Sequence, residues 1–331
     1  MSDRRLGGMV AVLGFGNQGE AQALNLRDSG VEVVVGARPG HAGEARARAL
    51  GFAVHPLGPA AGLAAVVAML VPDEAVPQVW PEVAAALTPR GTLLFAHGFA
   101  LVYSDLAFPE GHDVVLVSPT GPGRVLRALY ERGQGLPAYL AVHRDPSGRA
   151  WGTAEAYAEA IGCARAALWR TTVTEETEVD LFGEQAVLCG GMNALVTAAF
   201  ETLVARGYRP EMAYLECVHQ LKYLADLLHE QGVAGLREKI SSTALFGDLT
   251  RGPRVVGEAV RAEMTRVLDE IRNGTFAREW GAEVAAGRLR LRVLVDQASH
   301  HPIEAARKTA LGHPPEPGTT REESRKTLSK N

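Results

Sequence analysis

The chain has 331 residues, of which 47% are apolar and 22% charged, as is usual for a soluble globular protein long enough for two domains. Its net charge of −4 gives no reason to expect nucleic acid or an anionic membrane as a partner. The three cysteines form no CxxC pair, and neither a signal peptide nor an apolar run of about 18 residues is found, so a soluble, cytoplasmic protein is predicted.

The first predicted element is a buried strand, Met9–Leu13, which runs directly into Gly14-Phe15-Gly16-Asn17-Gln18-Gly19. A helical pattern follows from Glu20 to Ser29, and Val31–Gly36 is a second strand. In a GxGxxG turn between strand and helix, the glycines permit the turn, the approach of a pyrophosphate and helix–strand packing. The N–H groups at the helix start hold the phosphates. The sequence therefore predicts a dinucleotide-binding Rossmann domain.

The loop after the second strand is expected to select the dinucleotide. Arg38 suits the 2′-phosphate of NADP, and His41 could assist when protonated. Glu44 comes later, where a carboxylate at a helix N-terminus is the simpler interpretation. NADPH is therefore the predicted cofactor, with NADH left open.

Further strands are predicted in alternation with helices, at Ala64–Val71, Gly91–Ala96, Val114–Val117 and Ala138–Val142. In an open, doubly wound parallel sheet, ligands bind beyond the carboxyl ends of the strands. Asp73, His97 and Gly123 follow such ends and are expected to lie beside the Gly-rich turn. From its position alone, His97 is equally well explained as a structural residue or as a contact to the cofactor.

The second half of the chain is predicted to be almost wholly helical. A Rossmann domain is assigned to residues 1–170, an all-α domain to 171–312, and a disordered tail, rich in Pro, Glu, Lys and Ser, to 313–331. The predicted helices are Asp180–Ala205, Pro210–Glu230, Gly232–Ser241, Pro253–Gly274 and Phe276–Ala286.

The all-α part opens with five carboxylates within ten residues, at positions 175, 176, 178, 180 and 184. On a helix, Asp180 and Glu184 project from one face and could bind a hard cation such as Mg²⁺. The alternative is an acidic helix start that is favoured by the helix dipole. We retain this second interpretation for Glu175, Glu176 and Glu178.

Several segments, in order and with near-constant spacing from about residue 8 to 305, resemble the class I (short-chain) ketol-acid reductoisomerases. They are the Gly-rich turn, Ala96–Phe99, Pro119–Gly123, Glu175–Gly190, Tyr214–Lys222, Ile240–Ala244 and Gly252–Val256. The resemblance implies a Rossmann domain, an all-α knotted domain, and a homodimer or larger oligomer with a shared active site. It also implies a Mg²⁺-dependent alkyl shift in 2-acetolactate, or its ethyl homologue, and reduction by NADPH to a 2,3-dihydroxy acid of branched-chain amino acid synthesis.

The resemblance also assigns roles to individual residues. Asp180 would bridge two Mg²⁺ ions, Glu184 would bind one, and Glu216 of the partner subunit would bind the other. Ser241 would contact the substrate carboxylate. The remaining assignments are His97 and Gly123 beside the nicotinamide and Arg38 at the adenosine phosphate.

Three departures from the family pattern stand out. Gln220 replaces a second metal-binding Glu, Thr120 replaces a Lys, and His41 and Gly43 stand where serines flank the 2′-phosphate. An amide can still offer one oxygen to a cation, but it lacks the negative charge of a carboxylate. We therefore expect one Mg²⁺ to bind firmly and a second to bind weakly. We expect a family member acting on a different 2-keto or ketol acid, with an authentic ketol-acid reductoisomerase and a non-catalytic nucleotide-binding oligomer as alternatives.

Overall fold

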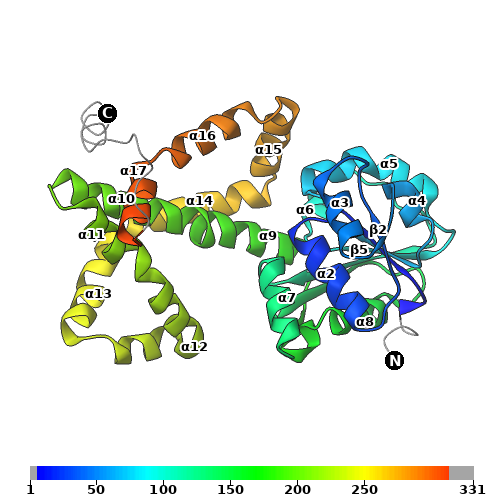
Figure 1. The fold of residues 1–331 in the computed structure, drawn as a ribbon, viewed down its shortest axis with the longest axis horizontal. Helices are drawn as coiled ribbons and strands as arrows, with labels where there is room; N and C mark the ends of the chain where they lie inside the picture. The colour runs from blue at the N-terminus through cyan, green and yellow to red at the C-terminus, as the bar shows by residue number, and fades with distance from the viewer. Residues whose placement is uncertain (1–5, 313–331) are drawn as a thin grey trace. The chain divides into compact units, whose positions relative to one another are not determined.

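The structure, a computed structural model, describes residues 6–312. The chain forms two compact units, Met1–Asp180 and Leu181–Asn331, and each has its own architecture (Figure 1). The tail predicted to be disordered, 313–331, lies outside the described residues.

The first unit is built on an eight-stranded sheet with the order β3-β2-β1-β4-β5-β6-β7-β8. Short apolar runs form its central strands because they are buried on both faces, as in β1 and β4. The strand order reverses between β1 and β4, which creates the crevice where ligands of such sheets bind. The strands are β1 (Val10–Leu13), β2 (Val33–Gly36), β3 (Ala53–His55), β4 (Val66–Met69), β5 (Gly91–Phe95), β6 (His112–Pro119), β7 (Ala138–Arg144) and β8 (Leu168–Arg170).

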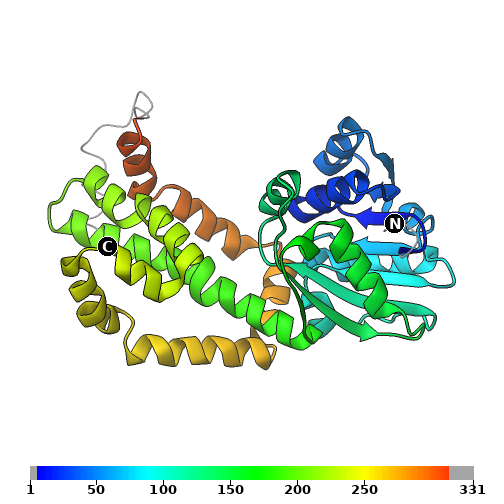
Figure 2. The ribbon, with the colours of Figure 1, turned by 90° about the horizontal axis from the view of Figure 1, so that it is seen from below.

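Helices cover both faces of this sheet, which confirms the predicted doubly wound α/β fold (Figure 2). Two buried apolar clusters, one on each face, hold the layers together. One face carries α2 (Asn17–Asp28), α3 (Ala42–Ala49), α7 (Gly123–Glu131) and α8 (Ala150–Ala160). The other carries α4 (Leu57–Ala61), α5 (Val76–Ala86) and α6 (Phe99–Tyr103), and the 3-10 turns η1 (Asp73–Ala75) and η2 (Cys163–Arg165) complete the unit.

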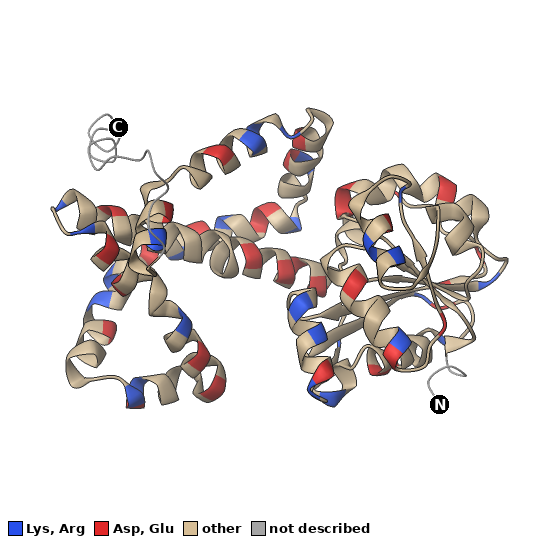
Figure 3. Cartoon of the chain, viewed as in Figure 1, with Lys and Arg blue, Asp and Glu red and all other residues tan. Residues whose placement is uncertain are grey.

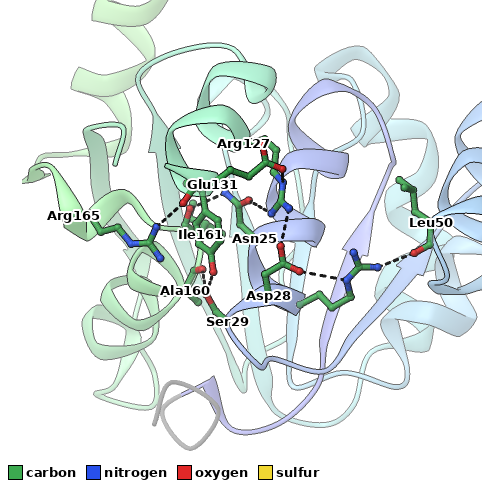
Figure 4. Close-up of polar contacts among 11 residues, drawn as sticks. Asn25, Asp28, Ser29, Leu50, Arg127, Glu131, Ala160, Ile161 and Arg165 are labelled. Carbon is green, nitrogen blue, oxygen red and sulfur yellow. Dashed lines mark hydrogen bonds and ion pairs between the residues drawn. The ribbon is translucent and has the colours of Figure 1, made fainter. Parts of the chain in front are cut away.

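A polar network fixes α2 against α7 and the end of α8 (Figure 4). The buried amide of Asn25 donates to the carbonyl of Ile161 at 2.9 Å and accepts from Arg127 at 2.9 Å. Arg127 also forms an ion pair of 2.7 Å with Asp28. Since a buried amide costs free energy unless it is hydrogen-bonded, these contacts allow Asn25 to be buried at the helix interface.

One strand differs from the predicted parallel arrangement. β7 is antiparallel to β6, and Ala138 pairs with Pro119. The chain leaves β6 at Pro119 and re-enters the sheet at the same end, since Ala138 is the partner of Pro119. The sheet is therefore parallel except at the β6–β7 pair, and the neighbouring pair β7–β8 is parallel.

The second unit is helical, as predicted. Its boundaries differ in places: Pro253 lies inside a helix rather than at the start of one, and two segments are π-helical. The helices from the linking helix onward are α9 (Val173–Gly183), π-helical η3 (Glu184–Leu188), α10 (Gly190–Ala205), α11 (Pro210–Tyr214), π-helical η4 (Leu215–His219), α12 (Leu221–Lys239), α13 (Ser242–Val255), α14 (Glu258–Arg272), α15 (Thr275–Ala285), α16 (Leu289–Ser299) and α17 (Pro302–Ala310).

The second unit has a small apolar cluster of its own and a large exposed apolar surface. The buried cluster consists of Phe200, Ala213, Tyr214 and Ala306. Large apolar side chains remain exposed along its helices, for example Leu188 (63%), Leu195 (53%) and Phe246 (64%). Surfaces of this kind mark sites where another molecule binds.

One helical stretch, Val173–Ala205, is long and apolar enough to cross a membrane by length and composition alone. It includes the acidic residues of α9 and η3, which Figure 3 shows along its course. Charged residues of both signs are interspersed over both units in the same view. A helix that becomes buried in a soluble protein passes the same test, so this stretch is weak support for a membrane span.

Candidate active site at the carboxyl ends of the strands

The Gly-rich turn after β1 has the local geometry that dinucleotide binding requires. Gly14 has a φ of +96°, and a Cβ there would lie 2.6 Å from the carbonyl oxygen of Leu70. A Cβ on Gly19 would lie 2.1 Å from the carbonyl oxygen of Gly14, so the third glycine allows α2 to pack on the turn. A Cβ on Gly16 would meet nothing within 4 Å, which leaves room for a phosphate against the backbone.

The start of α2 is held beside the start of α7. The Gln18 amide donates to the carbonyl of Gly121 at 2.9 Å, and the backbone N–H of Arg124 donates to Asn17 Oδ1 at 3.3 Å. A Cβ on Gly123 would lie 2.0 Å from the carbonyl oxygen of Asn17, so this close approach requires glycine. Gly16, the N-cap of α2, supplies no side-chain hydrogen bond to the first-turn N–H groups. These N–H groups can therefore hold an anion.

Phe15 is also part of this turn, but its side chain belongs to the core. It is buried and packs edge-on against Phe52, with ring centroids 5.6 Å apart. Only the backbone of Phe15 is therefore available to a cofactor.

The loop between β2 and α3 carries the residues predicted to select the dinucleotide. Arg38 and His41 are exposed, and the Arg38 guanidinium has no hydrogen bond or ion pair within residues 6–312. Glu44 closes the loop, because its carboxylate accepts from the Gly40 N–H at 2.7 Å and pairs with Arg48 at 2.9 Å. Arg48 and the Gly40 N–H hold the pKa of Glu44 below its ordinary value. The loop therefore presents the guanidinium of Arg38, which is unpaired within the described residues, whereas the carboxylate of Glu44 is neutralised by Arg48.

His97, directly after β5, lies between two carboxylates. Its Nδ1 is 3.0 Å from Asp73 Oδ2, and its Nε2 is 3.2 Å from Asp180 Oδ2, an ion-pair distance without the alignment of a hydrogen bond. Burial alone would lower the pKa of His97, but the Asp180 and Asp73 carboxylates outweigh it and raise the pKa to about 10. The structure thus brings together three predicted site residues around an imidazolium.

Glu176 lies in the first turn of α9, as the acidic-helix-start interpretation requires, but its side chain is buried, with 2% exposed. Its Oε2 accepts from the Gly98 N–H at 3.0 Å, and Ser118 supplies a further hydrogen bond. Burial raises the pKa of Glu176, and the His97 imidazolium and these hydrogen bonds oppose the shift.

Three of the four predicted residues of the second unit lie on or beside its π-helical segments. Glu184 opens η3, and Glu216 lies in η4. The Gln220 side-chain amide donates to Glu216 Oε2 at 2.8 Å. Ser241 is the N-cap of α13, and its hydroxyl oxygen accepts from the Ala244 N–H at 3.2 Å. π-Helical turns are rare and are often found at functional sites.

Comparison with known families is decisive. Residues 6–167 match the acetohydroxy acid isomeroreductase, NADPH-binding domain, and residues 173–311 match the ketol-acid reductoisomerase, C-terminal domain. The chain belongs to the ketol-acid reductoisomerase family. It is therefore an NAD(P)-dependent oxidoreductase, as the sequence predicted.

Solved structures agree with this membership. The chain is similar to an NADH-preferring ketol-acid reductoisomerase from an uncultured archean, with 37% identity, a TM-score of 0.89, and coverage of 92% of this chain and 94% of that one. A semialdehyde dehydrogenase NAD-binding protein from Cupriavidus necator shares the fold at 19% identity and a TM-score of 0.62, covering 80% and 99%. An oxidoreductase from Jannaschia sp. does so at 17% identity and a TM-score of 0.58, covering 80% and 97%.

Within the reductoisomerase family pattern, Thr120 stands where the resemblance implies a Lys. Its hydroxyl donates to the carbonyl of Pro137 at 2.9 Å, and its backbone N–H binds the same carbonyl at 2.9 Å. The side chain therefore completes the turn after β6. This position carries no cation in the present chain.

Two features of this reductoisomerase were not predicted from the sequence. The burial of Glu176 has no sequence signal beyond the neighbouring Gly98, whose small size permits the contact. The π-helical turn η3 has one: a Cβ on Gly190 would lie 2.2 Å from the carbonyl oxygen of Gln185. Adjacent glycines after an acidic helix could have indicated this wider turn.

Proposed function

We propose that this enzyme uses NADPH to reduce a 2-keto or ketol acid held by Mg²⁺, with or without alkyl migration, and that its substrate differs from 2-acetolactate. The observation that carries the proposal is the pair formed by His97 Nε2 and Asp180 Oδ2, 3.2 Å apart, to which the family resemblance adds an exchanged charge pair. His97 and Asp180 are kept, whereas Thr120 and Gln220 have replaced a cation and an anion of the family pattern.

The two exchanges offset each other. Thr120 removes one positive charge and Gln220 removes one negative charge, so the formal charge of the site is unchanged. Unselected loss of function would not ordinarily conserve that balance. A site adapted to another substrate accounts for it.

The donor set fits a hard divalent cation. Asp180, Glu184, Glu216 and Gln220 all offer oxygen, the ligand type that Mg²⁺ prefers. When bound, Mg²⁺ would polarise the substrate carbonyl that receives the hydride. Because Gln220 is neutral and its amide already donates to Glu216, we infer one firmly held ion and a weaker second one. Among the described residues, no three His, Cys, Asp or Glu side chains are grouped as a metal site.

The protein's own groups have distinct tasks in this proposal. The His97 imidazolium lies at ion-pair distance from Asp180 and offsets its charge. The Ser241 hydroxyl, whose oxygen accepts a backbone hydrogen bond, keeps its proton to donate to a substrate carboxylate. The starts of α2 and α7 hold the dinucleotide phosphates.

NADPH is the proposed hydride donor, and NADH is expected to bind more weakly. The free guanidinium of Arg38 at the end of β2 supports a contact to a 2′-phosphate. His41 at the N-cap of α3 can assist when it is protonated. Glu44, paired with Arg48, holds the loop in shape and adds little net charge.

We further propose that the enzyme is a cytoplasmic homodimer or larger oligomer and that Glu216 acts in the partner subunit's site. The exposed apolar side chains of the second unit support this, since a second copy would remove them from water.

A second candidate is an authentic ketol-acid reductoisomerase that converts 2-acetolactate to 2,3-dihydroxyisovalerate. The observation that favours it is the 37% identity to such an enzyme over 92% of this chain. In that case Thr120 and Gln220 are tolerated substitutions.

The test is Mg²⁺-dependent oxidation of NADPH by the purified protein with 2-acetolactate and with a panel of 2-keto acids. We expect kcat/KM for one or more 2-keto acids to exceed that for acetolactate by at least tenfold. The double variant Thr120→Lys/Gln220→Glu should shift this ratio toward acetolactate. Acetolactate turnover equal to that of the archaeal relative would refute the altered substrate and support the second candidate.

A further inference from the structure

The first turns of α9 dock on the carboxyl ends of β5 and β6 through one buried acidic side chain. Glu176 accepts from the backbone N–H of Gly98, just beyond β5, and from Ser118 in β6. Two strand ends are therefore joined to one helix through a single carboxyl group. Glu176 is not among the residues proposed to bind the metal, the substrate or the cofactor.

The contact between Gly98 and α9 leaves no space for a larger side chain at position 98. A Cβ on Gly98 would lie 2.0 Å from Thr177 Oγ1, 3.0 Å from Glu176 Oε2 and 3.0 Å from Val173 Cγ1. The Thr177 hydroxyl is in turn committed, since it donates to the Val173 carbonyl at 2.8 Å. The backbone of the turn after β5 and the first turns of α9 therefore fit each other closely.

Asp180 follows Glu176 by four residues on the same helix, so the two side chains project from the same face. Glu176 contacts Gly98, and Asp180, one turn later, contacts the adjacent His97. Any rotation or withdrawal of α9 that breaks the first contact also separates the second pair.

We propose that Glu176 is a positioning residue, which fixes α9 on the strand ends so that the Asp180 carboxylate stays beside His97. The inference rests on the proposed function, in which Asp180 is a metal ligand. Glu176 acts through the placement of that ligand and does not itself contact the metal or the substrate.

The experiment compares four proteins in their full-length form: unaltered, Glu176→Ala, Glu176→Gln and Glu175→Ala. Glu175 is the matched control, because it is an exposed carboxylate in the same helical turn. Three quantities are measured: amide hydrogen exchange in peptides covering residues 96–103 and 173–180, the Kd for Mg²⁺ by calorimetry, and the Kd for NADPH by fluorescence.

We expect Glu176→Ala to exchange at least tenfold faster in both peptides and to bind Mg²⁺ about 10- to 100-fold more weakly, as for loss of a hydrogen bond to a charged group. Its Kd for NADPH should stay within twofold of the unaltered value. Glu176→Gln keeps an oxygen acceptor for Gly98 and should recover most of both losses. Glu175→Ala should match the unaltered protein.

Unchanged exchange in Glu176→Ala would overturn the inference. So would a Glu176→Gln variant as damaged as Glu176→Ala, or a parallel loss of NADPH binding, since either shows a general structural role. The proposed function fails separately, if the unaltered protein binds no Mg²⁺. In that event the exchange rates still decide whether Glu176 anchors α9.

Discussion

Gly16 and Gly19 belong to the same turn, yet the structure predicts opposite effects of adding one methyl group to each. A Cβ on Gly19 would lie 2.1 Å from the carbonyl oxygen of Gly14, whereas a Cβ on Gly16 would meet nothing within 4 Å. Gly16 also has an extended backbone that alanine can adopt. Gly19→Ala should therefore damage mainly the fold, and Gly16→Ala mainly the phosphate site.

The magnitudes follow from these distances. Overpacking at Gly19 costs about 1–3 kcal/mol, and the better helix propensity of alanine returns about 1 kcal/mol of that. At about 2–4 °C per kcal/mol, Gly19→Ala should lower the Tm by up to about 8 °C. Gly16→Ala exchanges one helix N-cap residue for a poorer one, at a cost of about 1 kcal/mol.

The assay is thermal unfolding with and without NADPH. At 100 times its Kd, NADPH stabilises a binding-competent protein by about 2.7 kcal/mol, which corresponds to a rise in Tm of about 5–11 °C. The unaltered protein should show this rise, and Gly16→Ala should not. If Gly16→Ala binds NADPH with unchanged affinity, the pyrophosphate does not lie against Gly16 and the argument from the open space is wrong.

Three further predictions concern Arg38, His97 and the exposed face of α10. Arg38→Ala should raise KM for NADPH about 10-fold or more, the effect of losing a charge-assisted hydrogen bond, and leave KM for NADH unchanged; equal effects on both would contradict a 2′-phosphate contact. Because the pKa of folded His97 is raised from 6.5 to about 10, its stabilisation is complete below pH 6.5 and is lost as the pH rises through 10. The unfolding free energy of the metal-free protein, from urea titrations, should therefore fall more steeply over that range than that of His97→Gln, and parallel curves would refute the charged imidazolium. Leu195→Glu should dissociate the oligomer in light-scattering measurements, whereas Leu63→Glu, an equally exposed position of the first unit, should not.

The sequence was sufficient for the parts of the fold whose signals are local. The strand–GxGxxG–helix–strand unit is encoded in continuous residues, and its turn has the geometry that the glycines imply. The position of His97 beside Asp73 also follows from a general property of open sheets, since both residues come directly after parallel strands.

Other features depend on contacts between distant segments and were not predictable. The direction of β7 depends on the end of the sheet at which the chain re-enters after α7, and the residues of β7 do not encode it. Short strands such as β3 and β8, with three residues each, lack a readable pattern and exist because a neighbouring strand pairs with them.

The same distinction between local signals and contacts of distant segments applies to the candidate site. Asp180 was proposed as a site residue from its spacing and from the family resemblance, but the acidic run gave no sign that one of its members would be buried. Glu176 and Glu175 are adjacent and chemically identical, and they differ only in the face of α9 on which they lie. Which face meets the strand ends is decided by the packing of Gly98 against Thr177, a contact between residues far apart in the chain.

Because the buried apolar cluster of the second unit is small, the proposed association makes the folding of this protein depend on its concentration. In the proposed oligomer, a helical unit that buries Phe200, Ala213, Tyr214 and Ala306, yet leaves Leu188 and Phe246 in water, would gain further apolar burial from another copy. Its stability then follows mass action, so the Tm rises with protein concentration. In a cell, reduced synthesis of such a chain would lower the folded fraction as well as the total amount, and losses of activity would exceed losses of protein.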